Sequence, residues 1–286
     1  MRNDTAPSAD GGWQFVWDVC GKPVVYYYIP FILSCYGLCT LLLKKLTNWQ
    51  GLKLQKLAGS LSMYPAFFIL IFYSHRAVVA DDRYWGISPV SSTDDHSSSP
   101  SYFRWHVSSS DCDLFANWYI AANIVQAMGQ IQTERAPLVY QLMAHHALSI
   151  ACYLSGYYFN RFRWWIAFAG CCEMTNLFLV PVFCCKEFFP EWIFQTWYLY
   201  NSRLLWWTFV THRLILFPVW LGLWYWDQQQ YPAEAKDLHW FERYGYPITI
   251  FGLLVLSVIW FRAISRGLRK QAIAYHEARR GDKKRS

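Results

Sequence analysis

Long apolar blocks separated by short polar segments run through the whole chain. Two of the clearest are PVVYYYIPFILSCYGLCTLLL at 23–43 and YPITIFGLLVLSVIWF at 246–261. A helix crosses the hydrocarbon core of a membrane with about 20 mostly apolar residues, and several blocks reach that length. The pattern therefore predicts an all-α, polytopic transmembrane helix bundle. We expect about seven spans, at 23–43, 57–80, 114–130, 138–156, 164–184, 199–226 and 246–264.

Composition agrees with a membrane location. Hydrophobic residues make up 55% of the 286 residues and charged residues only 16%, whereas soluble domains carry about 25% charged residues. Residues 1–22 are polar and contain no apolar h-region, so the first span is expected to act as the insertion signal. Seven of the nine cysteines lie in or beside apolar blocks, where a thiol acts as a small hydrophobe. Cys20 and Cys112 lie outside the spans, and whether they pair stays open.

The polar segments between the spans are short, and none is expected to form a soluble domain. The longest, 81–113, contains SPVSSTDDHSSSPSYF, which lacks apolar periodicity and is expected to be a flexible loop. Proline inside a span should kink its helix, and this applies to Pro65, Pro181 and Pro218.

Basic residues set the expected orientation. The segment 44–56 holds four lysines and no acidic residue, and the stretch after 264 is rich in arginine and lysine. Both belong on the cytosolic side by the positive-inside rule. With seven spans, the N-terminus and the loops at 81–113 and 227–245 then face the lumen. Asn3 begins an Asn-Asp-Thr glycosylation sequon on that lumenal end.

The basic C-terminal tail suggests contact with the membrane surface and a localisation signal. The net charge is +7, and much of it lies in RGLRKQAIAYHEARRGDKKRS. The tail directly follows a span, so we expect it to touch anionic lipid headgroups and expect no nucleic-acid partner. The chain ends KKRS, and Lys283 and Lys284 resemble the dilysine retrieval signal of the endoplasmic reticulum.

Several polar residues lie inside the spans, where each ionisable group costs about 2.5–3.5 kcal/mol on insertion scales. The ionisable residues are His145 and His146 in the fourth span, Glu173 in the fifth, and His212 and Arg213 in the sixth. The uncharged residues that accompany them are Asn123, Gln126, Gln141, Thr175, Asn176, Asn201 and Thr208.

Helical spacing indicates which of these groups share a face. Gln141 and His145 are four residues apart and lie on one face, whereas His146 is turned by about 100° from His145. The pair Glu173 and Asn176 shares a face, as do Asn201, Thr208 and His212. If these faces converge, Glu173 can pair with Arg213 or with a histidine.

Two roles fit such groups. They can hold helices together through interhelical hydrogen bonds, or histidines and a carboxylate can act as acid, base or acyl acceptor. Adjacent histidines point about 100° apart on a helix, unlike the i,i+4 pairs that bind a metal ion. No metal site is therefore expected.

The order of these motifs resembles the TLC domain. It is carried by NWYIAANIVQAMGQIQTERAPLVYQLMAHHALSIACYL, then EMTNLFL, then NSRLLWWTFVTHRLILFP. The family includes ceramide synthases, the translocating-chain-associating membrane protein and smaller TLC domain-containing proteins. The resemblance covers about 56–264 and implies an endomembrane lipid protein whose six-helix bundle follows one extra helix. The expected parts are a lumenal tail 1–22, a first span 23–43, a TLC domain 56–264 and a basic tail 265–286.

The chain also departs from ceramide synthases. Their His-Asp-x-x-Asp arrangement corresponds here to Ala169-Gly170-Cys171-Cys172-Glu173, which keeps only the last acidic position. Asn123 stands where family members often have Asp, and the homeobox-like insert of many animal ceramide synthases is absent. The smaller TLC domain-containing branch is the better match.

Three functions follow from the resemblance. The first is a protein of the endoplasmic reticulum or a related membrane that binds or handles lipid acyl chains and influences lipid composition. The second is an N-acyltransferase that moves a fatty acyl group from acyl-CoA to a sphingoid base, with His145 or His146 as base or acyl carrier and Glu173 orienting it. The third is a cargo or translocation accessory protein. Membrane lipids are the expected partners, acyl-CoA enters only as a co-substrate of the second function, and homo-oligomerisation is left open.

Overall fold

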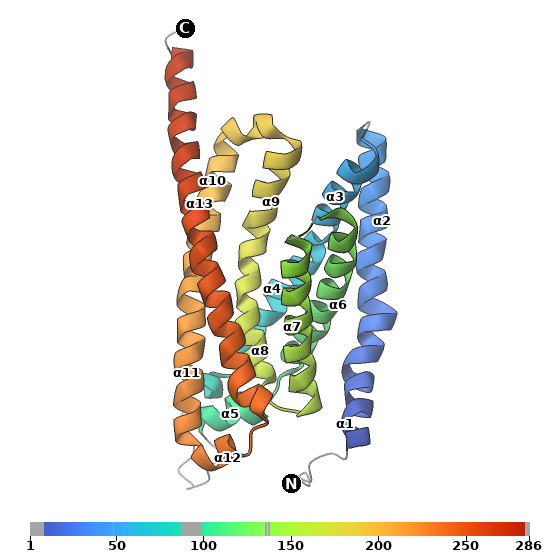
Figure 1. Ribbon diagram of the computed structural model, residues 1–286, viewed down its shortest axis with the longest axis vertical. Helices are drawn as coiled ribbons and strands as arrows, with labels where there is room; N and C mark the ends of the chain where they lie inside the picture. The colour runs from blue at the N-terminus through green and yellow to red at the C-terminus, as the bar shows by residue number, and fades with distance from the viewer. Residues whose placement is uncertain (1–8, 48, 87–98, 135, 137, 284–286) are drawn as a thin grey trace. The chain divides into compact units, whose positions relative to one another are not determined.

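The computed structural model describes residues 9–47, 49–86, 99–134, 136 and 138–283 (Figure 1). These residues form helices joined by short turns and contain no β-strand, which confirms the all-α prediction. The chain divides into two compact units, Met1–Gly170 and Cys171–Ser286. We call them the N-terminal and C-terminal units and describe each by itself.

The N-terminal unit is built around one polar helix. Its helices are α1 (Ala9–Val16), α2 (Ile29–Leu46), α3 (Gly51–Ser62), α4 (Tyr64–Val79), α5 (Pro100–His106), α6 (Ser110–Thr133), α7 (Leu138–Tyr158) and α8 (Arg163–Gly170). Helix α6 packs against α2, α3, α4, α7 and α8. Gly170 lets α8 approach it closely, because a Cβ at this position would overlap the ring of Phe115.

Ion pairs fasten both ends of α6 to other helices. At its N-terminal end Asp111 pairs with Arg76 of α4 at 3.3 Å. Just beyond its C-terminal end Glu134 pairs with Lys56 of α3 at 3.2 Å. The acidic residue at the first turn also favours the helix by its position at the positive end of the helix dipole.

The connection 81–113 is more ordered at its ends than the sequence suggests. A 3₁₀ turn, η3 (Asp82–Trp85), and helix α5 pack against each other, and α5 also packs against α8. The Asp81 carboxylate caps η3 and is hydrogen-bonded to Arg83, which lowers the pKa of Asp81. The expectation of a flexible loop was therefore wrong for 82–85 and 100–106, because buried aromatic side chains anchor them. The Ser-rich centre, 87–98, lies outside the described residues.

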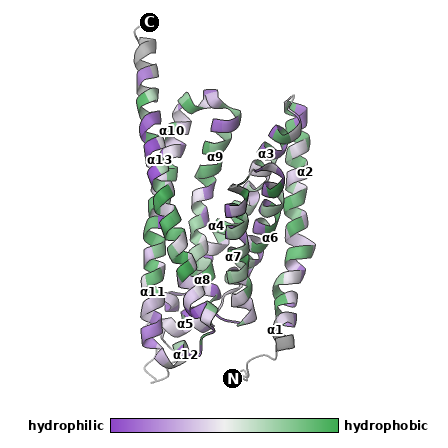
Figure 2. Ribbon diagram, in the orientation of Figure 1, coloured by the Kyte–Doolittle hydropathy of each residue, from purple (hydrophilic) through white to green (hydrophobic). Residues whose placement is uncertain are grey.

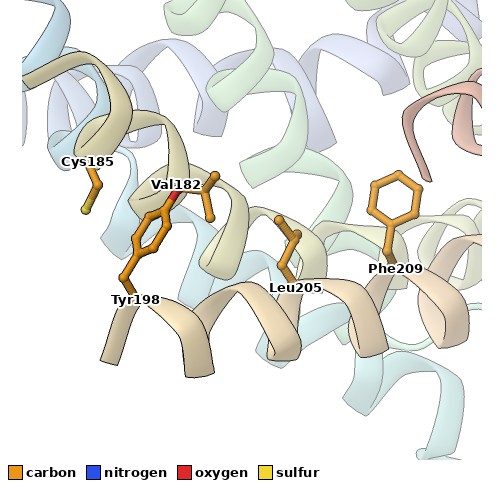
Figure 3. Close-up of a cluster of buried hydrophobic side chains, with 5 residues drawn as sticks. All are labelled: Val182, Cys185, Tyr198, Leu205 and Phe209. Atoms are coloured by element: carbon orange, nitrogen blue, oxygen red, sulfur yellow. The ribbon is translucent and has the colours of Figure 1, made fainter. Parts of the chain in front are cut away.

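The C-terminal unit consists of three long helical stretches. Its helices are α9 (Met174–Phe188), α10 (Thr196–Phe209), α11 (Leu216–Gln230), α12 (Pro232–Lys236) and α13 (Tyr246–Lys283). The short turns between them are η5 (Cys171–Glu173), η6 (Pro190–Phe194), η7 (Val210–Ile215) and η8 (Phe241–Gly245). A buried apolar cluster joins α9 and α10, as Figure 3 shows; it comprises Val182, Cys185, Tyr198, Leu205 and Phe209.

Helix α13 continues without interruption through the region expected to be a basic tail. It has 38 residues and reaches Lys283, so the tail from 265 onward is helical as far as it is described. Trp206 Nε1 donates to Ser265 Oγ at 3.0 Å, and the hydroxyls of Thr196 and Tyr275 are 2.9 Å apart. In Figure 2 the membrane-length part of α13 is mainly apolar and its C-terminal part is more polar.

The π-helical turns follow a simple rule. The turns Trp17–Gly21, Val24–Tyr28, η7 and η8 each end two or three residues before a proline, namely Pro23, Pro30, Pro218 and Pro247. Proline has no N–H to donate, and its ring clashes with the carbonyl four residues earlier, so the preceding turn widens. The other two prolines expected to kink spans differ. Pro65 begins α4 after a break at Met63, and α9 runs through Pro181.

Five described helical stretches are long and apolar enough to cross a membrane: Trp13–Leu46, Gly51–Val79, Arg163–Phe188, Thr196–Gln230 and Phe241–Tyr275. Helices α6 and α7, with 24 and 21 residues, have the length to cross, at about 1.5 Å per residue. Their polar side chains lower their mean hydropathy, however, and α6 and α7 are less apolar than the five stretches above. The helical bundle is confirmed, and the number of seven spans stays a prediction.

Candidate functional site

His146, in the predicted fourth span, has hydrogen-bond partners at both of its ring nitrogens. It is 5% exposed on α7. Its Nδ1 is hydrogen-bonded to Asn123 Oδ1, and its Nε2 lies 2.9 Å from Gln130 Oε1; both partners belong to α6. The Asn123 amide nitrogen donates to the Tyr119 carbonyl at 2.8 Å, which fixes the orientation of its side chain.

This arrangement constrains the protonation of the ring. Because Asn123 donates through nitrogen to Tyr119, its oxygen accepts from His146 Nδ1–H. A neutral imidazole has only one N–H, so Nε2 is then an acceptor. The Gln130 oxygen faces Nε2, so a neutral ring requires the Gln130 amide to present its NH₂ group there instead. The network therefore fixes the orientation of the ring, and in its neutral form Nε2 carries no proton and lies beside the Gln130 amide.

His145 lies beside this network but in a different environment. The two histidine rings have centroids 5.5 Å apart, and His145 is half-buried. Gln141, one turn earlier on the same face as His145, is exposed. The buried polar face of α7 is thus the one that carries His146.

The α6–α7 interface extends on both sides of His146. Tyr119 and Tyr153 stack with centroids 4.4 Å apart. Tyr157, fully buried, donates to the carbonyl of Asp113 at 2.9 Å and to Asn117 Oδ1 at 3.0 Å. The residue numbers of the contacting partners increase along α6 as they decrease along α7, which shows that the two helices are antiparallel. They pack closely over the length that includes His146.

An ion pair lies at the end of this interface formed by the N-terminal turn of α6. Arg163 Nη1 lies 2.8 Å from Asp113 Oδ1, and Nη2 donates to Asn160 at 3.0 Å. Asp113 precedes the predicted third span. Burial raises the pKa of Asp113, while the charge of Arg163 opposes that rise. The pair connects α6 to α8 at the end of the α6–α7 interface, whereas His146 contacts α6 nearer the other end.

Glu173 organises a separate polar group in the C-terminal unit. Its side chain is buried at the 3₁₀ turn η5, and it accepts a hydrogen bond from Asn176 Nδ2 at 2.6 Å. Asn176 therefore shares a face with Glu173, as the spacing predicts. The thiol of Cys172 lies 3.9 Å from the other carboxylate oxygen.

Arg213 approaches the same turn from η7. Its Nε donates to Thr175 Oγ1 at 3.1 Å, and its guanidinium lies 5.3 Å from the centroid of the Phe209 ring and 5.9 Å from that of Trp260. Its charge acts on Glu173, but within the described residues no ion pair shorter than 4 Å joins the two. Thr175 is the direct partner of the arginine, and the pairing of Glu173 with Arg213 stays a prediction.

The remaining sixth-span residues do not form one site. Asn201 donates to the Phe178 carbonyl of α9 at 2.9 Å. The Thr208 hydroxyl bonds back to Leu204 at 2.9 Å, and His212 Nδ1 contacts the Thr211 hydroxyl at 2.7 Å. His212 lies within the π turn η7, where the spacing differs from the 3.6-residue repeat on which the predicted common stripe depends.

The sequence-based candidates therefore fall into two groups. His145, His146 and Asn123 belong to the N-terminal unit, and Glu173, Asn176 and Arg213 to the C-terminal unit. Their convergence in one cavity stays a prediction. Asn3 and Lys284 lie outside the described residues, and the side chain of Lys283 is not described. In the part of the chain that is described, no three His, Cys, Asp or Glu side chains form a metal-binding group.

Gln130 is a functional candidate that the sequence reasoning missed. It lies seven residues after Asn123, which places both on one face of α6. It is the last residue of the predicted third span, 114–130. The i,i+7 spacing of the two amides was the signal that could have identified it.

Apolar helices of membrane length and buried polar groups between them define a polytopic α-helical membrane protein. The family model of the TLC domain matches residues 16–266. The chain belongs to the TLC-domain family, and the match includes the predicted first span. No curated protein and no solved structure matches the chain.

Proposed function

We propose that this TLC-domain membrane protein binds lipid acyl chains within its helices and influences the lipid composition of the endoplasmic reticulum or a related membrane. The observation that carries the proposal is the environment of His146. A buried histidine with both ring nitrogens in hydrogen bonds is a costly feature in a span. A half-buried histidine beside it offers an accessible polar group for the head of a lipid.

An N-acyltransferase is the second candidate, and the fixed orientation of the His146 ring between two amides supports it. A neutral imidazole that can accept a proton at Nε2 has the property required of a general base. In this function an amine loses its proton to the imidazole as it attacks the acyl-CoA thioester, and the thiol of coenzyme A leaves.

Mass spectrometry of lipids bound to the purified full-length protein tests the first function. His146→Ala and Glu173→Gln should accumulate as the wild type does, because interhelical hydrogen bonds in membranes are worth only about 1–2 kcal/mol. Both variants should retain less lipid. His145→Ala, next to the network, should also reduce retention.

Gln141→Ala is the matched control, since Gln141 is an exposed polar residue on the same helix as the histidines. It should leave both abundance and bound lipid unchanged. A labelled acyl-CoA and a sphingoid base, added to the same preparations, separate the two functions. Transfer of label that disappears in His146→Ala would establish the enzyme. Normal lipid retention by all three folded variants would overturn the binding proposal.

A further inference from the structure

Four basic residues form a stripe along the exposed side of α13. Arg262, Arg266, Arg269 and Lys270 follow an i, i+4, i+7, i+8 pattern, which places them on one helical face. All four are exposed, and none takes part in an ion pair within the described residues. The sequence has no acidic residue from 244 to 276, so no carboxylate in this part of α13 offsets the positive charge of the stripe.

The opposite face of this part of α13 is already occupied. Phe261 and Ile264 pack on the apolar cluster of α9 and α10. Ser265 and Tyr275 make the hydrogen bonds to Trp206 and Thr196 described above. The stripe is therefore held in a fixed direction, away from the helices of its own unit.

Aromatic side chains lie at the same level of the C-terminal unit. The turn η6 packs against both α10 and α13, and Phe189 and Trp192 stack there with centroids 4.4 Å apart. Trp192 contacts Trp197 at 6.0 Å, and both indoles remain more than 40% exposed. Exposed tryptophans beside the end of an apolar span are typical of the membrane–water boundary.

The two ends of the unit differ in charge. Two exposed basic residues, Lys186 and Arg203, lie at the same end as the stripe. Two acidic residues, Glu187 and Glu191, also lie at that end. The opposite end, 227–245, holds four acidic residues and two basic ones. The positive charge is thus concentrated at one end, where it follows directly on the apolar part of α13.

We propose that the basic stripe of α13, bordered by the aromatic residues of η6 and α10, binds the phosphate headgroups of anionic phospholipids in the adjoining leaflet. Arginine forks match phosphate oxygens and can bind them in a bidentate way. Long basic side chains at the end of a span extend along apolar surface and place their charges among headgroups. The interaction is independent of the lipid proposed for the His146 region.

Full-length protein in nanodiscs of phosphatidylcholine and phosphatidylserine provides the test. The ratio of the two lipids retained after detergent extraction is measured for wild type and for the variant R266Q/R269Q/K270Q. Each charge removed should reduce phosphatidylserine enrichment by about fivefold at low salt, corresponding to about 1 kcal/mol per basic residue at an anionic surface. The variant R266K/R269K keeps the charge and should retain most of the enrichment.

Matched controls remove charge elsewhere. K44Q/K45Q/K53Q removes the same number of charges from the N-terminal unit, and Lys236→Gln with Arg243→Gln acts at the opposite end of the C-terminal unit. Neither should lower phosphatidylserine enrichment to the level of the stripe variant. Equal losses in stripe and control variants would overturn the proposal, as would unchanged enrichment in the stripe variant.

A photo-crosslinking residue at the exposed Ile273, which continues the stripe face, identifies the occupant directly. Crosslinks to phosphatidylserine in excess of its share in the nanodisc support the proposal. In membranes from cells, crosslinks to an acidic protein in place of lipid would overturn it and assign the stripe to a protein partner. The same residue at Ile248, near the other end of α13, is the control and should show no phosphatidylserine preference.

Discussion

His146 on α7 is hydrogen-bonded through Nδ1 to Oδ1 of Asn123 on α6. The bond joins the central helix of the N-terminal unit to the helix that carries both histidines. Because the Asn123 amide is itself held by a backbone carbonyl, the histidine is oriented by a partner that cannot easily turn. A fixed imidazole is compatible with both of the proposed roles, lipid binding and proton transfer.

The Asn123–His146 bond should appear as a coupling energy. A double-mutant cycle with Asn123→Leu and His146→Leu is expected to give about 1 kcal/mol, the scale measured for interhelical hydrogen bonds in membranes. Thermal unfolding of the purified protein in detergent is the measurement. The control cycle pairs His146→Leu with Gln141→Leu, whose exposed side chain should give no coupling. Coupling of the same size in both cycles would contradict a specific bond.

Thr175→Val should destabilise the C-terminal unit. The change removes the oxygen that accepts from Arg213 Nε, and a buried donor left without a partner costs about 1–3 kcal/mol. Thr208→Val is the matched control, because its hydroxyl bonds only to carbonyls of its own helix. The thermal midpoint should fall clearly in the first variant and little in the second; similar midpoints would argue that Thr175 does not support the arginine.

Topology is expected to follow the basic residues, with the N-terminus in the lumen and the C-terminus in the cytosol. A tag after Ser286 should be removed by protease in intact microsomes, whereas a tag before Met1 should be protected. Glycosylation at Asn3 would support the same orientation. A protected C-terminal tag would overturn it.

Replacement of Lys283 and Lys284 by Ser is expected to release the protein from the endoplasmic reticulum, because the dilysine signal requires both positions at a cytosolic C-terminus. Fluorescence microscopy of the tagged full-length protein, with the tag placed at the N-terminus, is the measurement. Replacement of Arg279 and Arg280 by Ser removes equal charge upstream and should not change localisation. If the two variants behave alike, overall charge and not the signal determines retention.

Much of the fold follows from hydrophobicity alone. The apolar blocks predict the helices because a span must satisfy its own backbone hydrogen bonds in lipid. The histidine pair, the Glu173 segment and the Arg213 segment, in that order, indicate the family that the family model confirms. These features are local, so a sequence pattern contains them.

The site was less predictable because it depends on which faces meet. Spacing placed Gln141 with His145, but packing buries His146 and leaves Gln141 exposed. An ideal helical repeat also placed Thr208 and His212 on one stripe, but His212 lies in a π turn whose spacing differs from that repeat. Partners such as Gln130 come from another helix, and their contacts are set by tertiary packing that no local period records.

Helix α13 is an uninterrupted rod of 38 residues, about 57 Å long at 1.5 Å per residue, whereas the hydrocarbon core is only about 30 Å thick. When such a long helix tilts at one membrane surface, its other end is displaced at the opposite surface. A tilt of about 10° about its first residue would displace its last turn by about 10 Å. Ser265 and Tyr275 of α13 are hydrogen-bonded to Trp206 and Thr196 of α10. Tilting of α13 would therefore also move α10. If the proposed attraction of its basic side to a charged leaflet tilts α13, the displacement would pass through these bonds to α10, which leads directly into η7 and Arg213.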